Sequence, residues 1–254
     1  MSRECLTFDM PLKIAQITDV HLTLEGAPPM GINMQDRLRS VLEDLKSQNT
    51  DLIVLSGDLS YNHHEEAACN WIKKEVESSG IPFLVISGNH DESEKLAEDF
   101  NLNESLHAGE LYFTRNLKDT HIIFMDSSRG RISDEQIEWL IQEINQPGDL
   151  KLIFSHHPLM LASMPFMDSK HSLENHAEIS KHLFDSGKDI HVFSGHYHCD
   201  RVISNKNLHL HITPSLYVQL SDSNPEFEIS SKNGGYRIIE IDGERVVSKT
   251  HYLV

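Results

Sequence analysis

The sequence is poor in cysteine and in basic residues, and both shortages restrict what the protein can be. Its 254 residues include three cysteines, Cys5, Cys69 and Cys199, and none belongs to a C-x-x-C pair. An odd number of isolated cysteines is typical of reduced thiols in the cytosol. Lys and Arg total 22 against 39 Asp and Glu, so the formal net charge is −17. Such an acidic surface repels nucleic acid polymers and anionic lipid, which we exclude as partners.

The chain also lacks a long apolar run. No segment approaches the roughly 18 consecutive apolar residues of a membrane span, and the N-terminus MSRECLTFDMPLK has no secretory pattern. We therefore expect a cytoplasmic protein without membrane contact. Hydrophobic residues still make up 39% of the sequence, which is enough to bury a sizeable core. Because no linker or repeat interrupts them, we predict a single domain over residues 1–254, with residues 208–254 as strands that complete its sheets.

Short apolar runs alternate with helical patterns, which indicates an α/β fold. Leu38, Val41 and Leu45 fall on one face of a helix predicted over residues 34–46. Ser133 and Gln136 form a capping box that opens another helix. We predict a further helix at 65–78 and strands at 12–18, 52–55, 82–86, 152–154 and 190–193. In a sheet built this way, ligand sites lie at the carboxyl ends of the strands.

Polar clusters follow all five of these strands. They are Asp19-Val20-His21, Gly57-Asp58, Gly88-Asn89-His90-Asp91, His156-His157-Pro158 and Gly195-His196-Tyr197-His198. Any one of them could be a turn, a helix cap or a solvated loop, but their joint occurrence favours a metal site. If the strands lie side by side, the clusters share one edge of the sheet.

These side chains offer carboxylate, amide oxygen and imidazole, which are ligands for divalent or trivalent metals. Seven candidates are too many for one four-coordinate ion, and they suit two ions that share a carboxylate. The seven candidate metal ligands are Asp19, His21, Asp58, Asn89, His156, His196 and His198.

In this order, D-x-H, G-D, G-N-H-D, H-H-P and G-H-x-H resemble the motifs of the calcineurin-like metallophosphoesterase superfamily. The resemblance spans residues 19–198 and implies an α/β sandwich of two mixed β-sheets flanked by helices around a binuclear metal centre. It implies that one ion binds Asp19, His21, Asp58 and His198. It implies that the other binds Asp58, Asn89, His156 and His196, with Asp58 as the bridge. His90 is implied to be catalytic rather than a ligand, and His90, Asn89 and His198 are expected to contact substrate.

Segments between the motifs narrow the resemblance to the class III, bacterial branch of 3′,5′-cyclic AMP phosphodiesterases. They include Phe166-Met167-Asp168, Thr213-Pro214-Ser215 and Gly235-Tyr236-Arg237. That branch more often has Trp at the position of Phe166, and the loop over residues 126–132 looks shorter here. The first expectation is hydrolysis of 3′,5′-cyclic AMP to 5′-AMP. The alternatives are another small diester, such as a glycerophosphodiester or a 2′,3′-cyclic nucleotide, and a non-catalytic scaffold on the same fold.

If both ions are divalent, the charges of the expected centre also favour a diester, a preference that an Fe³⁺/M²⁺ pair would remove. Two divalent ions, two aspartates and a bridging hydroxide sum to about +1, which a diester monoanion neutralises. We expect this hydroxide to attack phosphorus and His90 to protonate the leaving alkoxide, with Asp91 orienting His90. The ligand set suits two ions drawn from Fe and Mn, and also Zn. Three arginines are candidates for assisting the phosphate, although no motif places them there: Arg37, Arg129 and Arg237.

Overall fold

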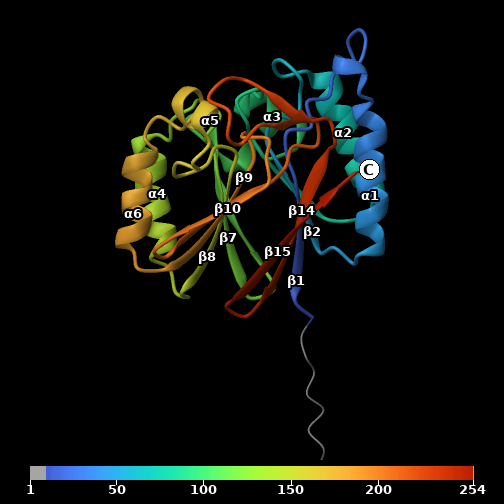
Figure 1. Ribbon diagram of the computed structural model, residues 1–254. Helices are drawn as coiled ribbons and strands as arrows, with labels where there is room; N and C mark the ends of the chain where they lie inside the picture. The colour runs from blue at the N-terminus through green and yellow to red at the C-terminus, as the bar shows by residue number, and fades with distance from the viewer. Residues whose placement is uncertain (1–9, 254) are drawn as a thin grey trace, which may run out of the picture.

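The computed structural model of the protein describes residues 10–253 and consists of two β-sheets packed face to face, with helices on the outer sides (Figure 1). The first sheet has the strand order β15-β14-β1-β2-β3, and the second has the order β10-β11-β9-β8-β7-β6. The expectation of a sandwich of two mixed sheets flanked by helices is therefore confirmed. Cys5 lies outside the described residues, and no helix within them is long and apolar enough to cross a bilayer.

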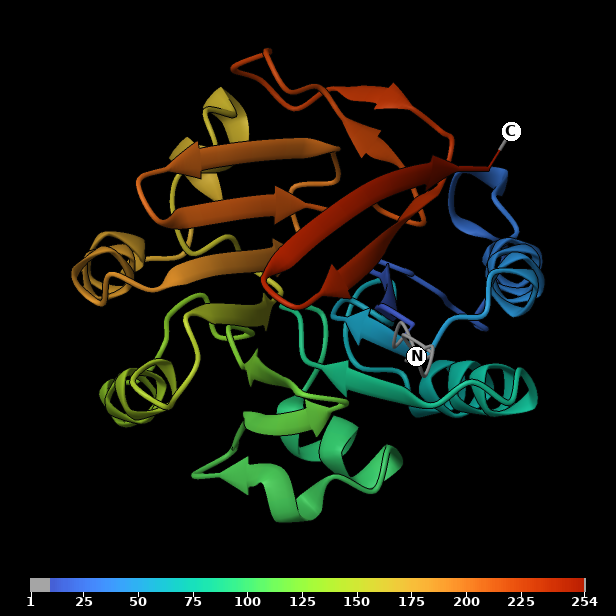
Figure 2. The ribbon, with the colours of Figure 1, turned by 90° about the horizontal axis from the view of Figure 1, so that it is seen from below.

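The first sheet contains three parallel strands extended by an antiparallel hairpin. Its strands are β1 (Leu12–Ile17), β2 (Leu52–Ser56), β3 (Phe83–Ile86), β14 (Gly235–Asp242) and β15 (Arg245–Tyr252). Helices α1 (Met34–Ser47) and α2 (Glu66–Ser78) lie on its outer side (Figure 2). The predicted apolar face of α1 is buried, and Asn33 caps its first turn by accepting a hydrogen bond from the Asp36 amide.

The second sheet lies against helices α4 (Asp134–Ile144) and α6 (His176–Asp185) on the other side of the molecule (Figure 2). Its strands are β6 (Phe113–Leu117), β7 (Thr120–Met125), β8 (Leu150–Ser155), β9 (Asp189–Ser194), β10 (Arg201–Asn205) and β11 (Leu208–Ile212). Four phenylalanines stack across β6, β7, β8 and β9 on the face toward the first sheet, with centroid distances of 4.8, 5.4 and 5.3 Å. This aromatic row forms part of the core between the sheets.

Shorter elements connect these strands. They are α3 (Ser93–Asp99), α5 (Pro165–Lys170), β4 (Leu106–His107), β5 (Glu110–Leu111), β12 (Gln219–Leu220), β13 (Ile229–Ser231) and two short 3-10 turns, 29–31 and 103–105. The predicted cap of α4 is confirmed, because Ser133 accepts a hydrogen bond from the Gln136 amide. The side chain of Gln136 does not return to Ser133, since it is buried and bonds both backbone groups of Asp126 instead.

The five strands that precede the polar clusters do not lie in one sheet. β1, β2 and β3 belong to the first sheet, whereas β8 and β9 belong to the second. Within each set the strands are parallel, so their carboxyl ends point the same way. The clusters therefore meet across the gap between two sheets rather than along a single edge.

Candidate active site

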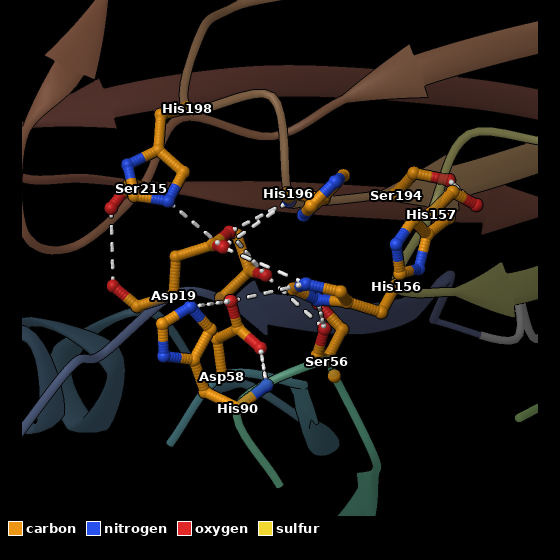
Figure 3. Close-up of polar contacts among 12 residues, drawn as sticks. Asp19, Ser56, Asp58, His90, His156, His157, Ser194, His196, His198 and Ser215 are labelled. Carbon is orange, nitrogen blue, oxygen red and sulfur yellow. Dashed lines mark hydrogen bonds and ion pairs between the residues drawn. The ribbon is translucent and has the colours of Figure 1, made fainter. Parts of the chain in front are cut away.

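The loops after these strands bring the candidate ligands together between the sheets. The carboxylate of Asp19, after β1, lies 3.1 Å from Nε2 of His198, which follows β9 (Figure 3). The carboxylate of Asp58, after β2, lies 3.4 Å from Nε2 of His156, which follows β8. Each contact joins one sheet to the other. Asn89 has an exposed side chain that lines the pocket above them.

Two groups of ligand atoms result, and each is compact enough to surround a cation. Donor atoms lie within 4.8 Å of one another in the first group, Asp19, His21 and His198. The same holds for the second group, Asp58, His156 and His196. Asp58 Oδ2 lies between them, because it is also 3.7 Å from Nε2 of His21.

The four histidines of these groups each use one ring nitrogen to contact a backbone carbonyl. Nδ1 of His156 lies 2.8 Å from the Ser56 oxygen, and Nδ1 of His198 lies 3.0 Å from the Val218 oxygen. His21 and His196 make similar contacts through Nδ1 and Nε2, at 3.4 and 3.0 Å. A carbonyl can only accept, so the contacting nitrogen donates, and in the neutral ring the other nitrogen keeps its lone pair. This arrangement fixes the tautomer of a metal-binding histidine.

The carboxylates are oriented as well. Asp19 accepts hydrogen bonds from the Thr18 hydroxyl at 2.8 Å and from the His196 amide at 3.0 Å. Asp58 accepts one from the His90 amide at 2.8 Å. Thr18 carries no motif signal, so its role was not predictable from the sequence. It fixes one carboxylate oxygen and leaves the other directed at the histidines.

Five of the seven candidate ligands have a left-handed backbone, with φ between 45° and 62°. They are Asp19, His21, Asp58, His196 and His198. This conformation costs a non-glycine residue roughly 1–3 kcal/mol, and such residues concentrate at functional sites. The turn redirects each side chain from the end of its strand into the space between the sheets.

Three glycines stand where the ligand loops approach one another too closely for any side chain: Gly57, Gly88 and Gly195. A Cβ atom on Gly88 would collide with the carboxylate of Asp58 and the ring of His156. A Cβ atom on Gly195 would collide with Thr18 and the carboxylate of Asp19. The glycines of the G-N-H-D and G-H-x-H motifs are therefore required by the packing around the ligands.

Burial of the site and the charges within it shift the pKa values of its side chains in opposite directions. Burial disfavours ionisation of both aspartates, but the neighbouring histidines outweigh it and lower the pKa of each carboxyl. Burial also opposes protonation of His156 and His198, yet the carboxylates raise both values, that of His156 to a pKa of about 10. For His21 and His196 burial dominates and lowers the pKa to about 4 and about 3. Without a cation, the protein therefore holds a proton on His156 at neutral pH.

His90 lies over the site with its side chain 31% exposed, and its Nε2 is 3.8 Å from Asp58 Oδ2. Asp91 does not orient it, contrary to the prediction. The buried Asp91 carboxylate instead accepts hydrogen bonds from the amides of Gly88 and Leu59, at 2.9 and 3.1 Å. It thus joins the loops after β2 and β3. Burial and the nearby Asp58 raise its pKa to about 7.

A pocket of about 370 Å³ opens above these residues. Five of the seven candidate ligands form its polar floor, all except Asp19 and His156. Its apolar wall contains Phe166, Met167, Phe227, Tyr217 and Ile229. The rings of Phe166 and Phe227 pack edge to face with centroids 5.8 Å apart. Tyr217 and Phe227 belong to no motif of the sequence and were not predicted. Among the described residues, the 126–132 loop contributes nothing to the lining.

The three candidate arginines are engaged elsewhere. Arg237 is buried and bonds Asp200 at 2.8 Å, while Arg37 donates to backbone carbonyls that include Leu216, at 3.1 Å. Arg129 donates to the carbonyl of Gly109 at 3.0 Å. None of the three lines the pocket. The positive charge that an anionic substrate needs must therefore come from another source.

The family pattern described as calcineurin-like phosphoesterase matches residues 12–200. The chain belongs to this family. The phosphoesterase is 32% identical over 241 residues to a probable cyclic nucleotide phosphodiesterase of Fibrobacter succinogenes, covering 95% of this chain and 94% of the relative. It is 26% identical over 247 residues to the 3′,5′-cyclic adenosine monophosphate phosphodiesterase CpdA of Escherichia coli, covering 92% and 86%.

Solved structures agree with the fold of the phosphoesterase. A dimetal phosphatase from Danio rerio superposes with a TM-score of 0.68 at 13% identity, covering 94% of this chain and 99% of that one. A purple acid phosphatase from yellow lupin gives 0.66 at 13% identity, covering 95% and 51%. At these identities the likeness concerns the fold alone.

The residues present fit bound metal ions. Nε2 of His156 is buried and has no hydrogen-bond partner within the described residues, although it lies 3.4 Å from a carboxylate oxygen. A buried lone pair facing an anion is costly unless a cation or a proton lies between them. The protein is thus a metal-dependent phosphoesterase whose clusters of Asp and His suit a binuclear site.

Proposed function

We propose that the phosphoesterase hydrolyses 3′,5′-cyclic AMP to 5′-AMP with two metal ions bound between its sheets. The first ion would bind Asp19, His21, Asp58 and His198. The second would bind Asp58, Asn89, His156 and His196. The position of Asp58 Oδ2, 3.7 Å from the His21 nitrogen and 3.4 Å from the His156 nitrogen, supports a bridging role.

Bound in this way, the ions would supply a nucleophilic water of lowered pKa and positive charge for the phosphoryl oxygens. The protein's own groups orient the ligands. The carbonyl contacts of the four histidines hold their lone pairs toward the ions, and Thr18 holds the Asp19 carboxylate. Since no arginine of residues 10–253 lines the pocket, substrate binding would depend on the ions, His90 and Asn89, and on His198 at the floor.

His90 is the group best placed to move a proton. Its partly exposed ring rises from the floor of the pocket, and its amide is fixed by Asp58. A ribose alkoxide is a poor leaving group unless it is protonated, so a histidine beside it acts as a general acid. The donor atoms of His90, His21 and Asp58 also lie within 4.8 Å of one another, so a ligand role for His90 is the competing assignment.

The shape of the pocket supports a small diester with a flat group. About 370 Å³ falls near the lower end of the roughly 300–1,000 Å³ that small-molecule sites occupy. The floor would take the phosphate, and Phe166 and Phe227 offer aromatic surface on which a nucleobase can stack. A glycerophosphodiester has no nucleobase to stack on these two rings.

The observation that carries the substrate proposal is the likeness to relatives named as cyclic nucleotide phosphodiesterases along nearly the whole chain. The test is a panel assay with protein loaded with Mn²⁺. Its substrates are 3′,5′-cyclic AMP, 2′,3′-cyclic AMP and a glycerophosphodiester, with chromatography of the products. We expect 3′,5′-cyclic AMP to be the best substrate and 5′-AMP to be the product. Turnover of the glycerophosphodiester without turnover of cyclic AMP would overturn the proposal.

A further inference from the structure

A second histidine cluster lies at the opposite end of β9 from the active site. Asp189 and His191 point from β9 to the same side as His209 of the neighbouring strand β11, because His191 and His209 are paired in register. Asp189 begins β9, and His196 of the active site follows its other end. The two residues are seven positions apart, and nearly extended chain of that length spans roughly 20 Å. The cluster is therefore a separate feature, which no step of the phosphoesterase reaction uses.

The three side chains converge on one point. Asp189 Oδ1 lies 3.2 Å from Nε2 of His209 and 3.7 Å from Nε2 of His191. The donor atoms of all three residues lie within 4.8 Å of one another. Ligands placed about 2.0–2.2 Å from a tetrahedral Zn²⁺ ion are roughly 3.3–3.6 Å apart, which is close to the measured distances. Little movement is needed to enclose an ion.

The other nitrogen of each ring is already engaged. Nδ1 of His209 lies 2.8 Å from the Ser204 hydroxyl, and Nδ1 of His191 lies 3.0 Å from Nε2 of His211. His211 in turn contacts the Ser248 hydroxyl through Nδ1 at 3.2 Å. If each Nδ1 donates, both Nε2 lone pairs face the Asp189 carboxylate. Outer contacts of this kind orient histidines in metal sites and select the tautomer that binds.

We propose that Asp189, His191 and His209 form a third cation site, which takes a borderline divalent ion such as Zn²⁺. Two imidazoles and one carboxylate select Zn²⁺ over Mg²⁺ or Ca²⁺, which prefer oxygen ligands. The side chains are 48, 14 and 28% exposed, so water can reach the ion and complete its coordination. An ion there ties β9 to β11, the strands whose carboxyl ends carry His196 and Thr213.

The competing interpretation is a plain ion pair between His209 and Asp189, with Nε2 of His209 donating. That arrangement needs no contribution from His191. The molecule offers a matched pair of this simpler kind on β7, where Nε2 of His121 lies 3.0 Å from Glu143 and Nδ1 lies 2.8 Å from Asn116. His121→Asn is therefore the control variant, because it removes a similar pair that has no second histidine.

The test counts ions on the full-length protein. The chain is first saturated with Mn²⁺ and then dialysed against micromolar Zn²⁺, and total Mn plus Zn per chain is measured by mass spectrometry. Because the sum is counted, exchange at the active site does not alter the result. We expect one ion fewer in His209→Asn and in Asp189→Asn than in the native chain, and no loss in His121→Asn. Turnover of a phosphodiester by each variant confirms that it is folded.

Position is tested by anomalous scattering at the zinc edge from crystals soaked in Zn²⁺. The expected result is a peak between Asp189, His191 and His209 that is absent in His209→Asn. An equal ion count in native and His209→Asn protein, or zinc peaks confined to the active site, would overturn the proposal. Since the active site is filled and assayed separately, neither outcome depends on which phosphodiester the enzyme prefers.

Discussion

The two ends of β9 carry histidine clusters that are built in different ways. At the carboxyl end, five of the seven candidate ligands lie in left-handed turns, most are buried, and the four histidines are held by backbone carbonyls. At the amino end, Asp189 and His191 lie on regular strand, are partly exposed, and are held by other side chains. Regular strand can present only alternate residues on one face. Strained turns allow Asp and His side chains from two sheets to meet, and this suits a binuclear centre.

The largest effect is expected at Asp58, the residue proposed to join the two ions. Asp58→Ala removes a ligand from each ion and leaves buried histidines without their counter-charge. The loss of several kcal/mol of transition-state stabilisation lowers kcat/KM about 10³-fold or more. A chelator applied to the native enzyme gives the same loss, which Mn²⁺ reverses. Asp119→Ala, in the exposed β6–β7 turn, is the control, and full activity of metal-stripped protein would contradict the binuclear account.

The His90→Ala variant distinguishes a general-acid role of His90 from a role as a metal ligand. Cyclic AMP hydrolysis should fall about 10²–10⁴-fold, because the ribose alkoxide then leaves without a proton. Bis(p-nitrophenyl) phosphate should lose much less, since nitrophenolate leaves unprotonated. The checks are kcat on both substrates and metal content of the same preparation, expected to stay at two catalytic ions per chain. Equal losses on both substrates would assign His90 to phosphate positioning, and loss of an ion would make it a ligand.

Thr18→Val tests whether the Thr18 hydroxyl orients the Asp19 carboxylate for metal binding. The change removes the hydroxyl that holds Asp19 Oδ2 but keeps the volume. Loss of such an outer contact costs about 10–100-fold in metal affinity or activity. The comparison is Thr114→Val on edge strand β6, and the readout is the Mn²⁺ concentration that gives half-maximal activity. Equal values for both variants would show that Thr18 has no orienting role.

The two clusters should also differ in their response to pH. At the active site, the pKa of His156 is raised to about 10, so a metal ion must displace its proton at neutral pH. Metal affinity therefore rises with pH, by up to about tenfold per unit for each proton released. At the second cluster, burial lowers the pKa of His191 to about 4, so Zn²⁺ displaces no proton from it. Titration calorimetry in buffers of different ionisation enthalpy measures the protons released, and none at the active site would contradict this.

The smallest effect is expected at the mouth of the pocket. Phe227 is 62% exposed and packs on Phe166, so Phe227→Ala removes part of the aromatic wall. Stacking of one base is worth about 1–3 kcal/mol, and an exposed ring should give the lower value, about fivefold in KM for cyclic AMP. The rate kcat should hardly change, and a substrate without a base should show no effect. A loss in kcat alone would assign Phe227 to something other than binding the base.

Local patterns were enough to predict part of this molecule. The apolar face of α1, the Ser133 cap of α4 and the five strand ends with their polar clusters all follow from short-range rules. The division of those strands between two sheets did not follow, because pairing partners are set by tertiary contacts. The β6–β7 hairpin was also missed, since its edge strand buries one residue of five and lacks a clear apolar alternation.

The candidate site, like the fold, was predictable from the sequence only in part. The ligand types are visible in the sequence because metal chemistry restricts them to a few residues. Their orienting partners are not, because a carbonyl such as that of Ser56 or Val218 is available from any residue type. The hydrogen bonds that engage Arg237 and Asp91 outside the pocket could not be predicted either, since they depend on which strands and loops come together in space. Ligand identity is thus a property of the sequence, and ligand geometry is a property of the fold.

Anomalous scattering from crystals loaded with Mn²⁺ tests the central claim most directly. We expect two peaks between the sheets, separated by about 3.5–4 Å, with Asp58 bound to both. The first should be ligated by Asp19, His21 and His198, and the second by Asn89, His156 and His196. A single peak at this site, or His90 in place of one of these ligands, would contradict the account.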